Sequence, residues 1–255
     1  MKTLLTLFCL TGALCCAQQN SSQDMQGMNM PGHDMSKMSA QDSAEDADAS
    51  MHAMNSMEGH HMDMGPHMKM TALRTPQPGD AEKAQKVVEV ARGVMEKYKD
   101  YHVALNEGFK IFHPEVPQKQ YHVTNYRYAF AARFNFDPEH PTSLLYEKNG
   151  EDYRLVGIMY TAPKRFTEDD LNQRIPLSIA QWHEHVKFCR APQGHRQEML
   201  APNPKFGLKG SITTKEECDA NGGEFYPIVF NWMVHLYPLE KSSAQIWSVD
   251  RQHAD

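Results

Sequence analysis

Methionine and histidine side chains concentrate between residues 25 and 70 of the sequence. Of the 17 methionines in the chain, 12 lie in this segment, and five of the 14 histidines are interleaved with them. Thioether sulfur is a soft, neutral ligand that suits Cu(I), and imidazole adds affinity for Cu(II). We therefore expect this segment to bind copper, with Cu(I) favoured. The candidate ligands are Met25, Met28, Met30, His33, Met35, Met38, Met51, His52, Met54, Met57, His60, His61, Met62, Met64, His67, Met68 and Met70.

The main alternative for this segment is an oxidant sink, because methionine sulfoxide formation is reversible. That role alone leaves the interleaved histidines unexplained. A core-packing role fails because the segment contains no Leu, Ile, Val or Phe to accompany the methionines. In composition the segment resembles the Met- and His-rich segments of periplasmic copper-resistance proteins and copper-binding chaperones. The resemblance implies sequestration or delivery of copper or silver.

A second group of histidines follows further along the chain. In a strand, residues i and i+2 share a face. His183 and His185 then present two imidazoles on one side, and Met233 and His235 share a face in the same way. Two antiparallel strands that set these pairs opposite each other would bring three imidazoles and a thioether together. The candidate ligands of this domain site are His122, His183, His185, Met233 and His235.

The chemistry of such a site depends on its last position. Three imidazoles with an open position form a catalytic or substrate-binding site for zinc or copper, and an added methionine closes it. The alternative is that one histidine is a hydrogen-bonded core residue and the other is solvated. Glu184 falls on the opposite face, where we expect a solvent-facing carboxylate rather than a group that orients the ligands. Surface positions are expected for His102, His113, His140, His195 and His253.

Several short motifs between residues 97 and 237 resemble a little-characterised family of exported bacterial proteins. The motifs are Lys97-Tyr98-Lys99-Asp100, Gly108-Phe109, Tyr121-His122-Val123-Thr124-Asn125, Pro141-Thr142-Ser143-Leu144-Leu145-Tyr146-Glu147, Leu155-Val156-Gly157, Trp182-His183-Glu184-His185 and Met233-Val234-His235. The resemblance implies a common fold and a shared histidine site at His122, His183 and His235, bordered by Tyr121 or Tyr237. It implies no particular reaction.

Other classes of function lack their motifs. The sequence has no Gly-x-Ser-x-Gly elbow, no P-loop, no dinucleotide-binding glycine pattern and no Cys-x-x-Cys-His haem attachment. The net charge is −6, and residues 18–72 carry eight acidic residues against two lysines. The rest of the chain is near neutral. A nucleic-acid interface would need a basic face, so we expect no nucleic-acid partner.

The N-terminus predicts export. Residues 1–17 combine one lysine, an apolar run and a small residue, Ala17, which is the pattern of a removable signal peptide. Lipid attachment at Cys15 or Cys16 is an alternative, but the residue before each is not the usual small one. No later run is apolar and long enough for a transmembrane helix. We expect a periplasmic or secreted protein.

The remaining chain divides into a tail, one domain and a short polar end. Residues 18–79 are too polar to bury a core, so we expect a disordered tail and linker. Residues 80–240 form one domain of the α+β class, with an amphipathic helix on a mainly antiparallel sheet. Residues 241–255 are expected to be a polar C-terminal tail. Cys189 and Cys218 predict one disulfide in an oxidising compartment, with two free buried thiols as the alternative.

The domain's helices are expected from their caps and periodicity. Asp80 is the expected N-cap of the first helix, and a second helix runs to Asn106 and stops at Gly108. Residues 167–173 form a short helix capped by Thr167, and residues 213–220 form one that carries Cys218.

The strands are expected from apolar runs and turn residues. An Asn149-Gly150 turn joins runs 143–147 and 153–161 in a hairpin. Strand-like runs also cover residues 121–130, 175–188 and 225–237.

Three functions fit these observations. The first is a copper-binding protein that captures the ion outside the cytoplasm, stores it in the domain or passes it to a copper exporter or acceptor protein. The second is a copper- or zinc-dependent exported enzyme, redox or hydrolytic, whose tail loads the metal. The third is a domain that binds no metal and serves as a scaffold for the tail.

Overall fold

The computed structural model describes residues 65–114, 116, 118–150, 152–249 and 251. The expected signal peptide and the candidate ligands from Met25 to Met64 lie outside the described residues, as does His253. The described residues belong to one compact unit, His61–Asp255. None of the helices in the described part of the chain is long and apolar enough to cross a membrane.

The eight strands of the described residues form one antiparallel sheet. Its strands are β1 (Met68–Met70), β2 (Lys110–Ile111), β3 (Tyr121–Thr124), β4 (Ser143–Asn149), β5 (Asp152–Ala162), β6 (His183–Arg190), β7 (Glu224–Ile228) and β8 (Trp232–Leu236). The spatial order is β1-β6-β8-β5-β4-β3-β2, and β7 pairs with β6. All of these pairings are antiparallel, as expected for the α+β class with a mainly antiparallel sheet.

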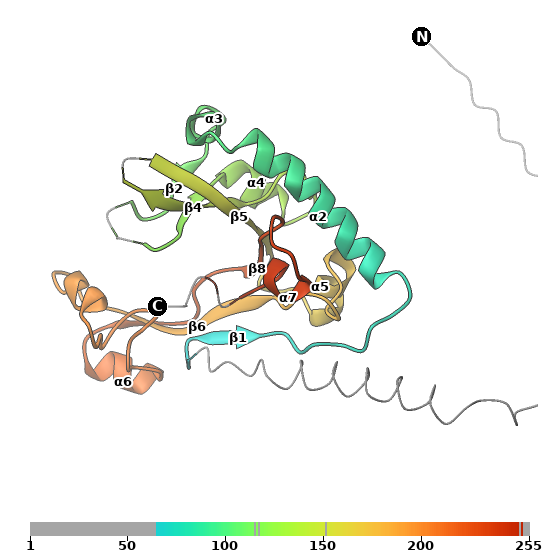
Figure 1. The fold of residues 1–255 in the computed structure, drawn as a ribbon. Helices are drawn as coiled ribbons and strands as arrows, with labels where there is room; N and C mark the ends of the chain where they lie inside the picture. Colours follow the sequence, from blue (N-terminus) through green and yellow to red (C-terminus); the bar gives the residue numbers. More distant parts are fainter. Residues whose placement is uncertain (1–64, 115, 117, 151, 250, 252–255) are drawn as a thin grey trace, which may run out of the picture. The chain divides into compact units, whose positions relative to one another are not determined.

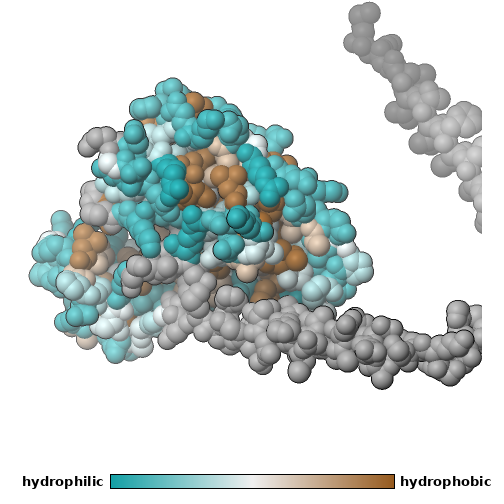
Figure 2. All heavy atoms as spheres, in the orientation of Figure 1, coloured by the Kyte–Doolittle hydropathy of each residue, from teal (hydrophilic) through white to brown (hydrophobic). Residues whose placement is uncertain are grey.

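The helices lie around this sheet. They are α2 (Asp80–Lys97), α3 (Tyr101–Asn106), α4 (Tyr126–Ala131), α5 (Glu168–Arg174), α6 (Lys215–Ala220) and α7 (Ser243–Ile246), with a 3-10 turn at Arg196–Leu200. Figure 1 shows α2 running along one side of the sheet. On the side of the molecule seen in Figure 2, apolar side chains gather in the part of the view where α2 and β5 lie, with hydrophilic ones around them.

Helix α2 covers one face of the sheet through an apolar stripe. The stripe consists of Ala84, Val87, Val88, Ala91, Val94 and Met95, all buried. It packs in one core with alternate residues of the central strands, such as Leu144, Ile158 and Val234. Asp80 is the first helical residue rather than the N-cap, because its carboxylate accepts hydrogen bonds from the Gln77 amide and the Ser178 hydroxyl.

Three elements expected from turn and capping residues are present in the structure. Gly150 has a φ of 64° in the β4–β5 hairpin, the left-handed conformation such a tight turn requires. The Thr167 hydroxyl accepts from the Asp170 amide at the start of α5. Helix α6 carries buried Cys218 and is followed by Gly222, with a φ of 71°.

Three expected strands are shorter than their apolar runs. In the run 121–130, strand β3 ends at Thr124. The Asn125 side chain accepts hydrogen bonds from the amides of the next turn and so starts α4. The run that begins at residue 175 first makes a turn at Pro176, and the strand starts at His183. The run 225–237 is split into β7 and β8.

The fold extends beyond the expected limits at both ends. Residues 68–70 form β1, and the Thr71 amide donates to the Trp182 carbonyl at 2.8 Å, so the boundary expected at residue 80 comes too late. The C-terminal segment expected to be a polar tail contains α7. Its Ile246, Trp247 and Val249 are buried, and these three apolar side chains hold the segment on the domain.

A disulfide joins Cys189 of β6 to Cys218 of α6, with 5.7 Å between their Cα atoms. Both cysteines are buried in a small satellite core with Ala191, Phe206 and Ile212. Gly223 lies against both sulfurs, so close that an added Cβ would stand 2.6 Å from the Cys189 sulfur. The bond therefore fixes α6 on the strand that carries His183 and His185.

We predict that the double substitution Cys189→Ser/Cys218→Ser lowers the free energy of unfolding by about 3–4 kcal/mol. The reason is that the bond closes a loop with a sequence separation of 29 residues in the unfolded chain. Urea denaturation of residues 18–255 measures the change, and the wild type under a thiol reductant is the control that should match the variant. An unchanged denaturation midpoint would contradict the prediction.

Candidate functional site

Four histidines lie together on the face of the sheet opposite α2. The ring centroids of His183 and His235 are 4.8 Å apart, those of His122 and His235 are 5.8 Å apart, and those of His183 and His185 are 5.6 Å apart. We call the face that bears these four residues the histidine face. The sequence predicted this set, and the structure brings all four rings into one continuous row.

Strand register explains two of the three ring contacts, His183 with His235 and His183 with His185. His183 of β6 pairs directly with Met233 of β8, so the two side chains share a face. His235, two residues on, is the diagonal neighbour of His183 on that face. His185 follows His183 at i+2 on the same strand. The alternation that the sequence predicted is therefore the alternation of the sheet.

The contact between His122 and His235 requires a curled sheet. Their strands, β3 and β8, are separated by β4 and β5, which is about 14 Å in a flat sheet. The two rings are nevertheless 5.8 Å apart. The histidine face is therefore concave.

The curl arises at a bulge and a glycine in the β4–β5 pair. The register between these strands shifts at Leu145/Tyr146, and such bulges bend a strand and increase its twist. Gly157 lies beside the bulge, where the Tyr237 ring approaches so closely that an added Cβ would stand 2.6 Å from Tyr237 Cδ1. Only a residue without a side chain permits this approach.

Tyr237 also holds one end of the row, His122, against His235. Its hydroxyl donates to the Gln120 side-chain oxygen at 2.8 Å, and both groups are buried. Burial raises the pKa of this hydroxyl, so it stays a proton donor. Gln120 precedes His122 by two residues, and Tyr237 follows His235 by two. The hydrogen bond therefore fixes β3 against β8 at the level of the two histidines.

Exposure increases from the middle of the row to its ends. The His183 and His235 residues are 0% and 1% exposed, whereas His122 and His185 are half-buried. The Phe230 ring lies 5.7 Å from that of His185 and 5.8 Å from that of Phe112. Two aromatic rings therefore border the histidine face near His185. Solvent reaches the row at His122 and His185.

The residues between the histidines point to the other face, and one of them corrects an expectation. Glu184, expected to be solvent-facing, is only 1% exposed. Its carboxylate lies 3.5 Å from Lys69 Nζ, which in turn sits over the Trp232 ring. Burial raises the pKa of the Glu184 carboxyl, and the lysine charge opposes this in part.

The spacing of the four rings suits metal ligation. Two imidazoles that bind one ion through nitrogens at about 2.0–2.1 Å hold their ring centroids about 4.5–6.4 Å apart, depending on the angle at the metal. The distances between neighbouring rings in the row, 4.8–5.8 Å, fall within this range. Within residues 65–114, 116, 118–150, 152–249 and 251, however, no three His, Cys, Asp or Glu side chains form a group ready to hold a metal ion. Metal binding on this face therefore requires the imidazoles to turn toward one point.

Methionines share the histidine face. Met233 was predicted from the sequence and pairs with His183. Met159 was not predicted, although its place in the alternating run of β5 was the available signal; it pairs with His235. Met68 and Met70 were expected in the tail, but β1 places them opposite His185 and His183.

His67 is a different case from its neighbours. It was a candidate tail ligand, and it is 4% exposed. Its Nε2 lies 2.7 Å from the Gly210 carbonyl oxygen, and its Nδ1 lies 3.3 Å from that of Val186. Both ring nitrogens thus face backbone oxygens, and these contacts attach the segment before β1 to the rest of the domain. His102, His113 and His195 are exposed, as expected.

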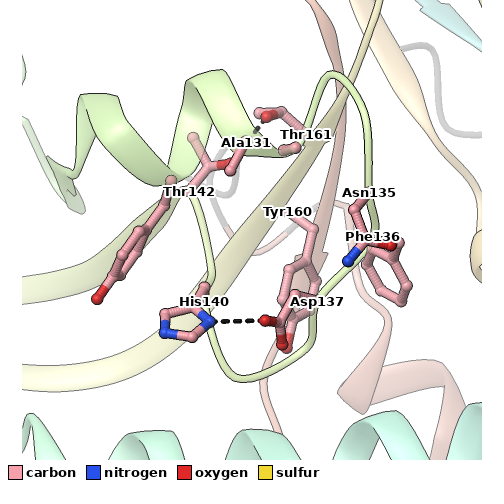
Figure 3. A pocket seen from close by; sticks show the side chains of 10 residues that line it. Ala131, Asn135, Phe136, Asp137, His140, Thr142, Tyr160 and Thr161 are labelled. Atoms are coloured by element: carbon pink, nitrogen blue, oxygen red, sulfur yellow. Dashed lines mark hydrogen bonds and ion pairs between the residues drawn. The ribbon is translucent and has the colours of Figure 1, made fainter.

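A pocket of about 190 Å³ lies elsewhere, between α4 and the segment 135–142 (Figure 3). His140 and Asp137 point toward one another at its edge, with 2.7 Å between Nδ1 and Oδ2. The Thr142 and Thr161 hydroxyls hydrogen-bond to each other at 2.8 Å. The pocket offers a single imidazole, and its polar groups satisfy one another, so its metal-binding chemistry is poorer than that of the histidine face.

Comparisons with known proteins found no relative. No family model matches the sequence, and neither a curated protein nor a solved structure matches the chain. The resemblance to a family of exported proteins therefore stays a prediction.

We predict opposite effects for alanine at two glycines. Gly157→Ala lowers the free energy of unfolding by about 1–3 kcal/mol, because the new methyl group meets Tyr237 and the Leu236 carbonyl oxygen. Gly93→Ala, in α2 with open space around its Cβ, raises it by about 0.5–1 kcal/mol. Urea denaturation compares the two, and NMR shifts of the His122 and His235 rings report the curl. Equal effects of the two substitutions would contradict our account of Gly157.

Proposed function

We propose that the protein binds copper outside the cytoplasm and sequesters, stores or delivers it, with a histidine-based site in the domain. The row His122, His235, His183 and His185, with ring centroids 4.8–5.8 Å apart, is the observation that supports this proposal. The methionine- and histidine-rich sequence between residues 25 and 70 supplies soft ligands of the same kind.

The composition of the histidine face favours binding and transfer over catalysis. A catalytic zinc or copper site keeps a position open for substrate. Here the thioether side chain of Met233 pairs with His183 on the same face, and Phe230 borders His185. A face that offers methionine beside histidine suits an ion as cargo, taken up and released. We include in this proposal a copper exporter or acceptor protein that receives the released ion.

We predict that His183→Ala and His235→Ala each remove one equivalent of tightly bound Cu(I) from the exported chain. These two rings are the buried middle of the row. Removal of either one leaves at most two neighbouring imidazoles, which are too few to hold the ion tightly. Titration against a competing Cu(I) chelator measures the stoichiometry.

His140→Ala is the matched control, because His140 is an exposed loop imidazole paired with Asp137. It should leave the stoichiometry unchanged. Wild-type stoichiometry in both His183→Ala and His235→Ala would reject the domain site and leave copper binding to the preceding segment.

A further inference from the structure

Strand β1 brings two methionines onto the histidine face. It pairs antiparallel with β6, with Met68 opposite His185 and Met70 opposite His183. Directly paired residues of antiparallel strands point to the same side. The contact of Lys69 with Glu184 on the other face, 3.5 Å between Nζ and Oε2, confirms this orientation independently.

Each of the three C-terminal histidines in the row therefore has methionine as its cross-strand partner. His185 faces Met68, and His235 faces Met159 on β5. His183 lies between two methionines, Met70 on β1 and Met233 on β8. Cβ atoms of such pairs lie about 4.5–5.5 Å apart, which is within reach for a flexible thioether and an imidazole that share an ion.

The two methionines of β1 are placed as accessible ligands rather than as core. Met68 and Met70 are half-buried, whereas Met233 and Met159 are buried. β1 is the end strand of the described sheet. A strand this short at the end of a sheet contributes little apolar burial, and leucine or valine would serve that purpose equally well. Sulfur is what methionine adds.

We propose that Met68 and Met70 are thioether ligands of the domain site and that they make it selective for Cu(I). This inference rests on the proposed copper function and specifies the oxidation state of the cargo. Imidazole alone also accepts Cu(II) and Zn(II) and so does not select Cu(I). Soft thioether sulfur, by contrast, favours Cu(I) and binds Zn(II) poorly. β1 is then a part of the site and not a spacer between the methionine-rich segment and the domain.

The test uses Ag(I), a diamagnetic ion with the ligand preference of Cu(I), and the exported chain labelled with ¹³C at the methionine methyl groups and ¹⁵N in the histidine rings. The spectra resolve individual residues, so the other methionines do not obscure the result. We expect the Met68 and Met70 methyl resonances to shift at the same equivalent of Ag(I) as the His183 and His185 rings.

The variant Met68→Leu/Met70→Leu keeps side-chain volume and removes both sulfurs. We expect its domain site to bind Ag(I) at least about tenfold more weakly, with Zn(II) affinity unchanged. Met199→Leu is the control, because Met199 packs with the disulfide's satellite core and should leave Ag(I) binding as in the wild type.

The outcomes separate the two proposals. If the histidine rings shift with Ag(I) while the Met68 and Met70 methyls do not, this inference fails and the proposed function stands. If neither the rings nor these methyls shift while other methionine methyls do, the proposed domain site fails together with this inference, and metal binding is left to the segment that precedes the domain. Equal Ag(I) affinity in Met68→Leu/Met70→Leu and the wild type would also overturn the inference.

Discussion

The close approach of the Tyr237 ring to the backbone of Gly157 is the constraint on which the histidine face depends. The bulge at Leu145/Tyr146 bends the sheet, and the Tyr237 ring packed on Gly157 stabilises that bend. The Tyr237 hydroxyl then bonds Gln120 across three strand spacings. A flat sheet would leave His122 and His235 about 14 Å apart, and the row would be reduced to the histidines of β6 and β8.

The two faces of the sheet are built for different ends. Against α2, the strands present aliphatic and aromatic side chains such as Leu144, Ile158 and Val234, which bury apolar surface and stabilise the fold. On the concave face, histidine and methionine occupy several of the equivalent positions, beside Leu145 and Val156. Imidazole is costlier to bury than an aliphatic group of similar size. His183 and His235, both buried, therefore stabilise the fold less than aliphatic residues of similar size would.

The sequence predicted what short-range patterns determine. Alternation along single strands identified His183 with His185 and Met233 with His235, and the Asn149-Gly150 turn located the central hairpin. Long-range pairing determined the rest. β1 has three residues, too few for the alternation Met-Lys-Met to identify a strand, and it forms because β6 offers it an edge. The segment 243–249 was missed because three apolar side chains among polar ones give too short a pattern. The curl depends on tertiary contacts of Gly157, which no local pattern reveals.

The disulfide limits which soft ligands remain for the proposed copper site. Thiolate would be the strongest soft ligand in this chain. Among the described residues both cysteines, Cys189 and Cys218, are bonded to each other, so imidazole and thioether are left. Such neutral ligands hold Cu(I) without the charge attraction that makes thiolate sites slow to release it. With His122 and His185 half-buried at the ends of the row, a ligand from another molecule has access to the ion. Weak ligands at an accessible edge suit a protein that passes copper on, whereas permanent detoxification would favour free thiols.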